Sequence, residues 1–255
     1  MSARLSPDAT NTWRGCIVIP TYDNPRTIRK VVEAARVFSL PVIVVDDGSA
    51  EAGRQACEEL ATLGLAHVIH HPVNQGKGAA LKTAFDAART LGFTHAIQVD
   101  GDGQHDLACV PPFVESSKQH PTALHLAYPV YDESVPKVRL IGRKLTNFWV
   151  NFEVGCGKIK DSMIGFRIYP LAAMSLVAVK ANRMDFDIEV AVKLAWAKTP
   201  LINLPVPVRY LSAEEGGVSH FQHFWDNFRF SRLHCKLCTL RCMAWLLPKR
   251  VLLKW

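Results

Sequence analysis

Short apolar runs alternate with helical stretches over the first hundred residues of this chain. Strands are expected at 16–20, 42–45, 67–70 and 96–99, and helices at 25–38, 52–63 and 76–91. Buried strands that alternate with helices are typical of a mostly parallel sheet covered by helices on both faces. In such sheets, ligands bind at the carboxyl ends of the strands. The pattern therefore predicts an α/β fold and draws attention to the residues that follow each strand.

Three of the expected strands end in acidic turns. These turns are Thr21-Tyr22-Asp23, Asp46-Asp47-Gly48-Ser49 and Asp100-Gly101-Asp102-Gly103-Gln104-His105. Asp and Gly are common in solvated turns, so a plain loop is an alternative explanation for any one of them. Carboxylates gathered in one crevice repel one another unless a cation offsets their charge. The three turns together favour a binding site.

The spacing of Asp100, Asp102 and Gln104 predicts a divalent-cation site. On an extended segment, side chains two residues apart point to the same side, which would bring the three oxygen ligands together. Mg²⁺ binds one or two carboxylates and completes its shell from water and substrate phosphates. We therefore expect Mg²⁺ or Mn²⁺ as the cofactor and a nucleotide diphosphate as the ligand that completes its coordination.

The ordered blocks carry a resemblance to a known family. Pro20-Thr21-Tyr22, Asp46-Asp47-Gly48-Ser49, the stretch 74–80 and the stretch 100–105 resemble the family 2 inverting glycosyltransferases of the GT-A fold. Within that family the chain is most similar to the dolichyl-phosphate and polyprenyl-phosphate sugar synthases. The match continues through 161–167 and 186–189 and covers roughly residues 15–220. The resemblance implies a GT-A fold and transfer of a sugar from a nucleotide diphosphate sugar by a single displacement.

The resemblance also implies the donor site. Tyr22 would lie against the nucleobase, and Asp47 would contact the base or ribose. Lys77 would lie near the nucleotide, because an ammonium group and a helix N-terminus both favour anions; a solvated lysine is the alternative. The family often has an acid where this chain has Asn24, which leaves the choice between a uridine and a guanosine donor open. The expected donor and metal residues are Pro20, Tyr22, Asp23, Asp46, Asp47, Lys77, Asp100, Gly101, Asp102 and Gln104.

The acceptor site is expected in the second half of the chain. Asp187 and Glu189 open an expected helix that runs to about residue 197 and fall where the family has acceptor-side acids. With Asp102 they are the expected catalytic residues, although capping of the helix is an alternative role for both acids. A lipid phosphate is already anionic and needs no strong base. The expected ligands for that phosphate are Arg167, Arg209, Ser219 and His220, for which a surface arginine and a loop histidine are the plain alternatives.

Basic residues are concentrated at the C-terminal end. Residues 225–255 hold seven Lys and Arg against one acid, in a chain with a net charge of +7, so residues 1–224 are nearly neutral. This distribution argues against a nucleic-acid groove across the fold and for an anionic membrane surface that contacts one end. Aromatic and leucine residues among these bases are typical of an interfacial helix. The stretch 137–152 has a similar apolar stripe, for which core packing is the alternative.

These observations predict three segments: an N-terminal polar arm at 1–13, a glycosyltransferase domain at 14–222 and a basic amphipathic tail at 223–255. No run reaches the ~18 apolar residues that a transmembrane helix needs, and the N-terminal stretch lacks the apolar region of a secretory signal. We therefore expect a protein bound peripherally to the cytosolic face of a membrane, with a lipid-linked acceptor. A soluble or polymeric hydroxyl acceptor, or a non-catalytic nucleotide-binding subunit, are the alternatives.

The cysteines favour a reduced protein. The chain has seven, an odd number, and four of them (Cys16, Cys57, Cys109 and Cys156) lie in core-like contexts. Cys235, Cys238 and Cys242 are spaced to fall on one helical face. A zinc site lacks its second pair of ligands, so acylation or a membrane-facing position is the preferred alternative there.

Overall fold

The computed structural model describes residues 12–131, 135, 137–208, 223–243 and 253. These residues form a seven-stranded sheet in the order β3-β2-β1-β4-β6-β5-β7. The strands are β1 (Gly15–Thr21), β2 (Val42–Asp46), β3 (His67–His70), β4 (His95–Gln98), β5 (Leu124–Tyr131), β6 (Arg167–Pro170) and β7 (Leu201–Val208). Pairing is parallel except at β6, which runs antiparallel to β4 and β5. The predicted mostly parallel sheet is confirmed.

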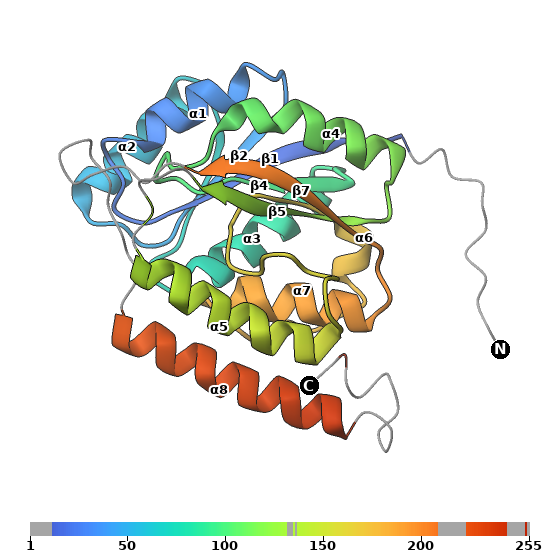
Figure 1. The fold of residues 1–255 in the computed structure, drawn as a ribbon. Helices are drawn as coiled ribbons and strands as arrows, with labels where there is room; N and C mark the ends of the chain where they lie inside the picture. The colour runs from blue at the N-terminus through green and yellow to red at the C-terminus, as the bar shows by residue number, and fades with distance from the viewer. Residues whose placement is uncertain (1–11, 132–134, 136, 209–222, 244–252, 254–255) are drawn as a thin grey trace.

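Helices cover both faces of the sheet (Figure 1). Helices α1, α2 and α4 lie on one face, and α3, α5 and α7 lie on the other, with α8 outermost beside α5. The helices are α1 (Ile28–Arg36), α2 (Glu51–Thr62), α3 (Lys77–Thr90), α4 (Val110–Gln119), α5 (Lys137–Val154), α6 (Leu171–Met174), α7 (Phe186–Trp196) and α8 (His223–Cys242). A hydrophobic cluster fills each side, one around Val32 and Phe113 and the other around Phe85 and Phe186.

The elements expected in the first hundred residues are found with small shifts at their ends. The largest shift is in α1, which begins at Ile28 because the backbone N–H groups of Thr27 and Ile28 both bond the carbonyl of Asn24 in a turn. The sequence pattern did not predict β6. Its four residues are all buried, with Tyr169 in the hydrophobic cluster on one face of the sheet and Ile168 in the cluster on the other. The strand therefore has no solvated face, and it lacks the regular alternation that marks one.

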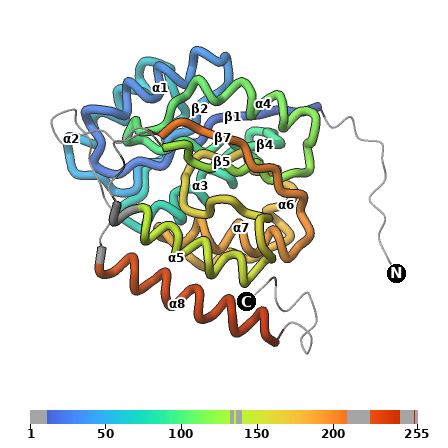
Figure 2. The backbone as a smooth tube through the Cα atoms, in the orientation of Figure 1, coloured from blue at the N-terminus to red at the C-terminus, as the bar shows by residue number. Residues whose placement is uncertain are grey.

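Helix α8 packs along α5 (Figure 2), and one of its faces belongs to the core. Phe230, Leu233, Leu237 and Leu240 are all buried. At the same interface His234 Nδ1 lies 2.8 Å from the Oε1 atom of the buried Glu153. The composition of the predicted tail did not reveal this packing. The proposed boundaries at residues 13 and 222 stay predictions, and residues 1–11 of the predicted arm and residues 244–252 lie outside the described residues. Trp13, at the end of that arm, donates from Nε1 to Ser117 Oγ at 2.9 Å.

The seven cysteines are all free thiols. Cys16 and Cys57 are buried and Cys109 is half-buried, in keeping with their apolar contexts. The expectation is wrong for Cys156, which follows α5 in a glycine turn and is exposed. On α8, Cys235 and Cys242 are exposed, whereas the Sγ atom of Cys238 lies 3.6 Å from Glu153 Oε1. Within the described residues, no helix is long and apolar enough to span a bilayer.

Candidate active site

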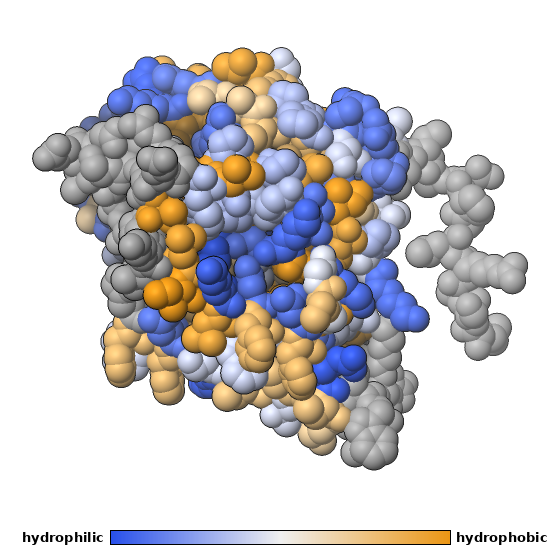
Figure 3. All heavy atoms as spheres, in the orientation of Figure 1, coloured by the Kyte–Doolittle hydropathy of each residue, from blue (hydrophilic) through white to orange (hydrophobic). Residues whose placement is uncertain are grey.

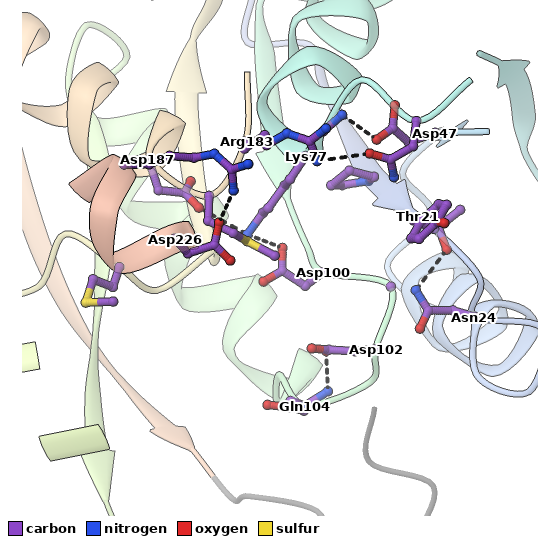
Figure 4. A pocket seen from close by; sticks show the side chains of 18 of the residues that line it. Thr21, Asn24, Asp47, Lys77, Asp100, Asp102, Gln104, Arg183, Asp187 and Asp226 are labelled. Carbon is purple, nitrogen blue, oxygen red and sulfur yellow. Dashed lines mark hydrogen bonds and ion pairs between the residues drawn. The ribbon is translucent and has the colours of Figure 1, made fainter. Parts of the chain in front are cut away.

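A cavity of about 520 Å³ lies at the carboxyl ends of β1, β2 and β4 (Figure 4). The lining residues come from every acidic turn that the sequence singled out, from the loop that leads into α3 and from three later segments. From the first half they are Pro20, Thr21, Tyr22, Asn24, Asp47, Asn74, Gly76, Lys77, Asp100, Gly101, Asp102 and Gln104. From the second half they are Met163, Arg183, Met184, Asp187, Asp226, Arg229 and Phe230. The cavity thus lies where a ligand of a parallel sheet is expected.

Lys77 lies between two carboxylates at the centre of the cavity. Its Nζ atom is 2.8 Å from Asp100 Oδ1 and 3.1 Å from Asp187 Oδ2. Burial lowers the pKa of Lys77, but the two carboxylates outweigh burial and raise it above its ordinary value. A Cβ atom at Gly165 would collide with both the Asp100 carboxylate and the Lys77 ammonium. The glycine therefore leaves the space in which this ion pair forms.

We expect Lys77→Met to lower the free energy of unfolding by about 3–5 kcal/mol, because it removes the nearest cation from both Asp100 and Asp187 and leaves them only the more distant His105 and Arg167, each at 3.8 Å. Chemical denaturation would measure this loss. The double variant Lys77→Met/Asp187→Asn removes one of the stranded charges and should recover part of the stability. An unchanged unfolding midpoint in the single variant would mean that the lysine does not neutralise these acids.

The proposed metal ligands line the cavity but not in the predicted conformation. Residues 101–103 form a turn in which Gly103 has φ +75°, and the Gln104 N–H donates to Asp102 Oδ1 at 3.0 Å. The expectation of an extended segment is therefore wrong. A turn nevertheless keeps Asp100, Asp102 and Gln104 on the wall of one cavity.

The protonation equilibria of the two aspartates differ. Burial raises the pKa of Asp100, but Lys77 and His105 lower it, and the net shift is downward. Burial and the charge of Asp100 together raise the pKa of Asp102. A cation beside Asp102 would offset both effects, so this carboxylate fits a divalent ion. In the described part of the chain, no three Asp, Glu, His or Cys side chains are arranged to hold a metal by themselves.

The three other acids expected at the donor site have different positions. Asp47 lines the cavity and accepts hydrogen bonds from the Gln75 and Gly76 N–H groups at 3.0 and 2.7 Å, so it fixes the loop that leads into α3. Asp46 and Asp23 do not line the cavity. Asp46 Oδ2 lies 2.8 Å from His70 Nδ1, and Asp23 Oδ1 accepts from the Ala50 N–H at the start of α2.

Asn24, rather than Asp23, reaches the cavity beside Pro20 and Tyr22. Its side-chain amide donates to Thr21 Oγ1 at 3.2 Å. Because Asp23 has φ +49°, the backbone turns there and directs the following residue toward the cavity. The position that departs from the family pattern therefore lines the same cavity as the two residues expected at the nucleobase.

Two residues expected at the acceptor site have structural contacts instead. Arg167 is fully buried, and its Nε, Nη1 and Nη2 atoms donate to the carbonyls of Ile164, Asp187 and Ser162. Its guanidinium therefore positions these backbone segments and is not exposed to a phosphate in the cavity. Glu189 is buried outside the cavity, where its Oε2 atom accepts from the Lys180 and Ala181 N–H groups. Asp187 does line the cavity. Arg209, Ser219 and His220 lie outside the described residues.

Four further residues that line the cavity were not expected there from the sequence: Arg183, and Asp226, Arg229 and Phe230 of α8. Arg183 Nη1 donates to Asn74 Oδ1 at 3.2 Å and so links the segment before α7 to the loop before α3. The α8 residues were counted only as part of a basic tail. The sequence does contain one sign that these residues interact: Asp226 lies three residues before Arg229, and on a helix that spacing allows an ion pair.

Comparisons with known proteins agree with this geometry. The model of the glycosyl transferase family 2 matches residues 16–180. A UDP-N-acetylglucosamine–dolichyl-phosphate N-acetylglucosaminyltransferase of Methanococcus voltae is 26% identical over 219 residues, which cover 78% of this chain and 86% of the relative. A polyprenol monophosphomannose synthase of Mycolicibacterium smegmatis is 27% identical over 219 residues, covering 80% of each chain.

Solved structures share the fold. Glucosyl-3-phosphoglycerate synthase of Mycobacterium tuberculosis, crystallised with Mn²⁺, UDP-glucose and phosphoglyceric acid, superposes with a TM-score of 0.64 over 91% of this chain and 80% of its own, at 18% identity. The sheet order and the cavity at its carboxyl edge accordingly belong to a GT-A fold. With the family model covering well over half of its length, the chain belongs to glycosyl transferase family 2 and is a glycosyltransferase.

Proposed function

We propose that this protein is a divalent-cation-dependent inverting glycosyltransferase that moves a sugar from a nucleotide diphosphate sugar to a lipid-linked acceptor at the cytosolic face of a membrane. The observation that supports it most is the joint presence of Tyr22, Lys77, Asp100 and Asp102 on the wall of one cavity. An aromatic ring suits a nucleobase, and an acid pair with an ammonium group suits a cation and a diphosphate.

Asp100, Asp102 and Gln104 would hold Mg²⁺ or Mn²⁺, and the ion would neutralise charge on the departing nucleotide diphosphate. The chain's own residues bind and orient the donor: Tyr22 and Asn24 at the base, and Lys77 at the centre of the cavity. The acceptor oxygen forms a bond to the anomeric carbon on the face opposite the diphosphate, while the bond from that carbon to the diphosphate oxygen breaks.

Asp187 is the acid of the acceptor side that lines the cavity. Its oxygens are engaged by Lys77 at 3.1 Å and by the Gln98 side-chain amide at 3.3 Å. Because both oxygens are engaged, the carboxylate is poorly placed to act as a general base, and this suits an acceptor oxygen that needs no deprotonation. A lipid phosphate has such an oxygen, and the names of the dolichyl-phosphate and polyprenol relatives support this acceptor class.

The membrane part of the proposal rests on exposed apolar side chains of α5 and α8. On α5, Ile141, Leu145, Phe148 and Phe152 recur at helical spacing and are all more than half exposed. On α8, Phe224, Trp225 and Phe228 are also more than half exposed. Apolar atoms extend over both helices in the lower part of the surface (Figure 3). Exposed aromatics beside Lys144 and Arg232 match the composition of an interfacial surface.

The acceptor class can be tested by incubating the protein with labelled nucleotide sugars, Mn²⁺ and a membrane lipid extract, followed by partition into organic solvent. We expect label to enter the organic phase. Label that stays in the aqueous phase with every donor, but appears on added soluble sugars, would overturn the lipid acceptor in favour of a hydroxyl acceptor.

Membrane contact predicts a specific effect of surface variants. Phe224→Ser/Trp225→Ser/Phe228→Ser should reduce co-sedimentation with anionic phosphatidylserine vesicles by about tenfold or more, because each large apolar side chain contributes ~1.5–3 kcal/mol when it leaves water. A matched control is Val37→Ser/Leu63→Ser/Leu91→Ser, which removes three exposed apolar side chains at the ends of other helices. Equal sedimentation of both triple variants with the parent protein would exclude α8 as the membrane contact.

A further inference from the structure

The first turns of α8 have two different surroundings. Asp226, Arg229 and Phe230 line the cavity, whereas Phe224, Trp225 and Phe228 are exposed. A single helix segment therefore connects the site of chemistry with the apolar surface. An amphiphile with an anionic head and a hydrocarbon tail fits both surroundings at once.

The cavity has two walls. In Figure 4, Thr21 and Asn24 lie on one side, Asp187 and Asp226 lie on the other, and Lys77 and Asp100 lie between them. The first wall carries the residues assigned to the nucleobase. The second wall, which α7 and α8 supply, therefore faces the part of the cavity left for an acceptor.

The three cations that line the described cavity are Lys77, Arg183 and Arg229. Lys77 is held between two carboxylates, and Arg183 donates to Asn74 of the donor loop. Arg229 belongs to the opposite wall. Its Nη1 atom lies 2.7 Å from Asp226 Oδ1, and 30% of its side chain is exposed. A guanidinium has five N–H donors in a planar fork, so an ion pair through one nitrogen is compatible with a second anion.

Arg229 differs in this respect from Arg167, whose three side-chain nitrogens all donate to buried carbonyls. The pairing with Asp226 also orients the Arg229 side chain before any ligand binds. A phosphate brought to Arg229 by an amphiphile would leave the hydrocarbon beside the exposed aromatics of the same helix.

We infer that Arg229 binds the anionic group of the acceptor, and that Phe224, Trp225 and Phe228 contact the acceptor's hydrocarbon. This inference rests on the proposed function, since it assumes a lipid phosphate acceptor. It assigns phosphate recognition to α8 rather than to the buried Arg167, and it makes Arg229 a determinant of acceptor specificity.

The test uses the full-length protein and farnesyl phosphate as a short-chain probe, with binding followed by calorimetry. The variants are Arg229→Gln and Arg229→Lys, and the matched control is Arg232→Gln, which removes the same charge from an exposed position one turn further along α8. We expect the dissociation constant to rise about tenfold or more for Arg229→Gln, because a charge-assisted hydrogen bond is lost. Arg229→Lys should recover part of the affinity, and Arg232→Gln should change it by less than about twofold.

Nucleotide diphosphate binding in the presence of Mn²⁺, measured on the same samples, reports whether each variant is folded. If Arg229→Gln does not fold, Arg229→Lys is compared with Arg232→Lys. The inference then predicts that loss of the planar guanidinium group weakens farnesyl phosphate binding at position 229 and not at position 232. An equal loss in the 229 and 232 variants, or no loss in either while the parent binds the probe, overturns the inference and leaves the lipid acceptor intact. If the parent binds farnesol as tightly as farnesyl phosphate, the lipid phosphate acceptor itself fails.

Discussion

Replacing Asp102 by asparagine is expected to lower the rate of sugar transfer by about a thousandfold or more while leaving the protein folded. The carboxylate is proposed to hold the cation that neutralises the departing diphosphate, and a metal ion contributes several kcal/mol to such a transition state. The fold should tolerate the change because burial and the charge of Asp100 already raise the pKa of Asp102. A neutral amide relieves that repulsion.

The matched control is Asp106→Asn, which removes the same charge from an exposed residue four positions along the same loop. Asp106 Oδ1 accepts from the Ala108 N–H, and asparagine is an equally good cap at that position. Initial rates with saturating donor would be compared for both variants, together with calorimetric titration of UDP and GDP in Mn²⁺ and in excess chelator. Equal nucleotide binding with and without the metal would contradict the cation site.

The common location of the proposed donor residues on one cavity could be predicted because each of them is marked by its local sequence. Asp47, Lys77, Asp100 and Asp102 each follow a strand or begin a helix, and the carboxyl edge of a parallel sheet brings such positions together. The backbone conformation that brings these residues to the cavity was harder to predict. The residues Asp100, Asp102 and Gln104 reach the cavity through a glycine turn, and not by the alternation of a strand.

The acceptor half could not be read in the same way, because burial decides which charged groups are free to bind a ligand. Arg167 and Glu189 both fall in blocks that match the family, yet each is fully or almost fully buried. The nitrogens of Arg167 bond backbone carbonyls, and Glu189 bonds backbone N–H groups and the buried Lys193. A sequence shows the charge of such a residue but not its partners. Asp187, two residues before Glu189, lies about 200° further round the same helical turn and does reach the cavity.

Helix α8 shows how composition can conceal two roles. A mixture of bases, aromatics and leucines predicts an amphipathic surface helix, and the exposed Trp225 and Phe228 agree with that expectation. The same composition also supplies Leu233 and Leu237 to the core and Arg229 to the cavity. Helical spacing separates these residues into exposed, core and cavity-lining positions. Which face of α8 is buried depends on where α5 lies, and that cannot be predicted from the sequence of α8.

Ending the chain at residue 222 is therefore expected to unfold the protein, although every proposed donor ligand lies before residue 105. Removal of α8 exposes the core that Phe230, Leu233, Leu237 and Leu240 now cover. At ~1.5–3 kcal/mol for each buried side chain, the loss is about 6–12 kcal/mol, which is comparable with the whole stability of a typical domain. Glu153 would also lose His234, its partner at 2.8 Å, from a buried position. Far-ultraviolet circular dichroism and nucleotide diphosphate binding would measure both consequences.

Single substitutions separate packing from surface chemistry on the same helix. Leu237→Ala should lower the free energy of unfolding by about 2–5 kcal/mol, since it opens a cavity at a fully buried site. Thr239→Ala, two residues further on an exposed position, should change it by less than about 0.5 kcal/mol. If the chain ending at residue 222 instead stays folded and binds nucleotide diphosphate with parental affinity, α8 is a separable tail, the predicted boundary is correct, and the contacts of α8 with α5 contribute little to stability.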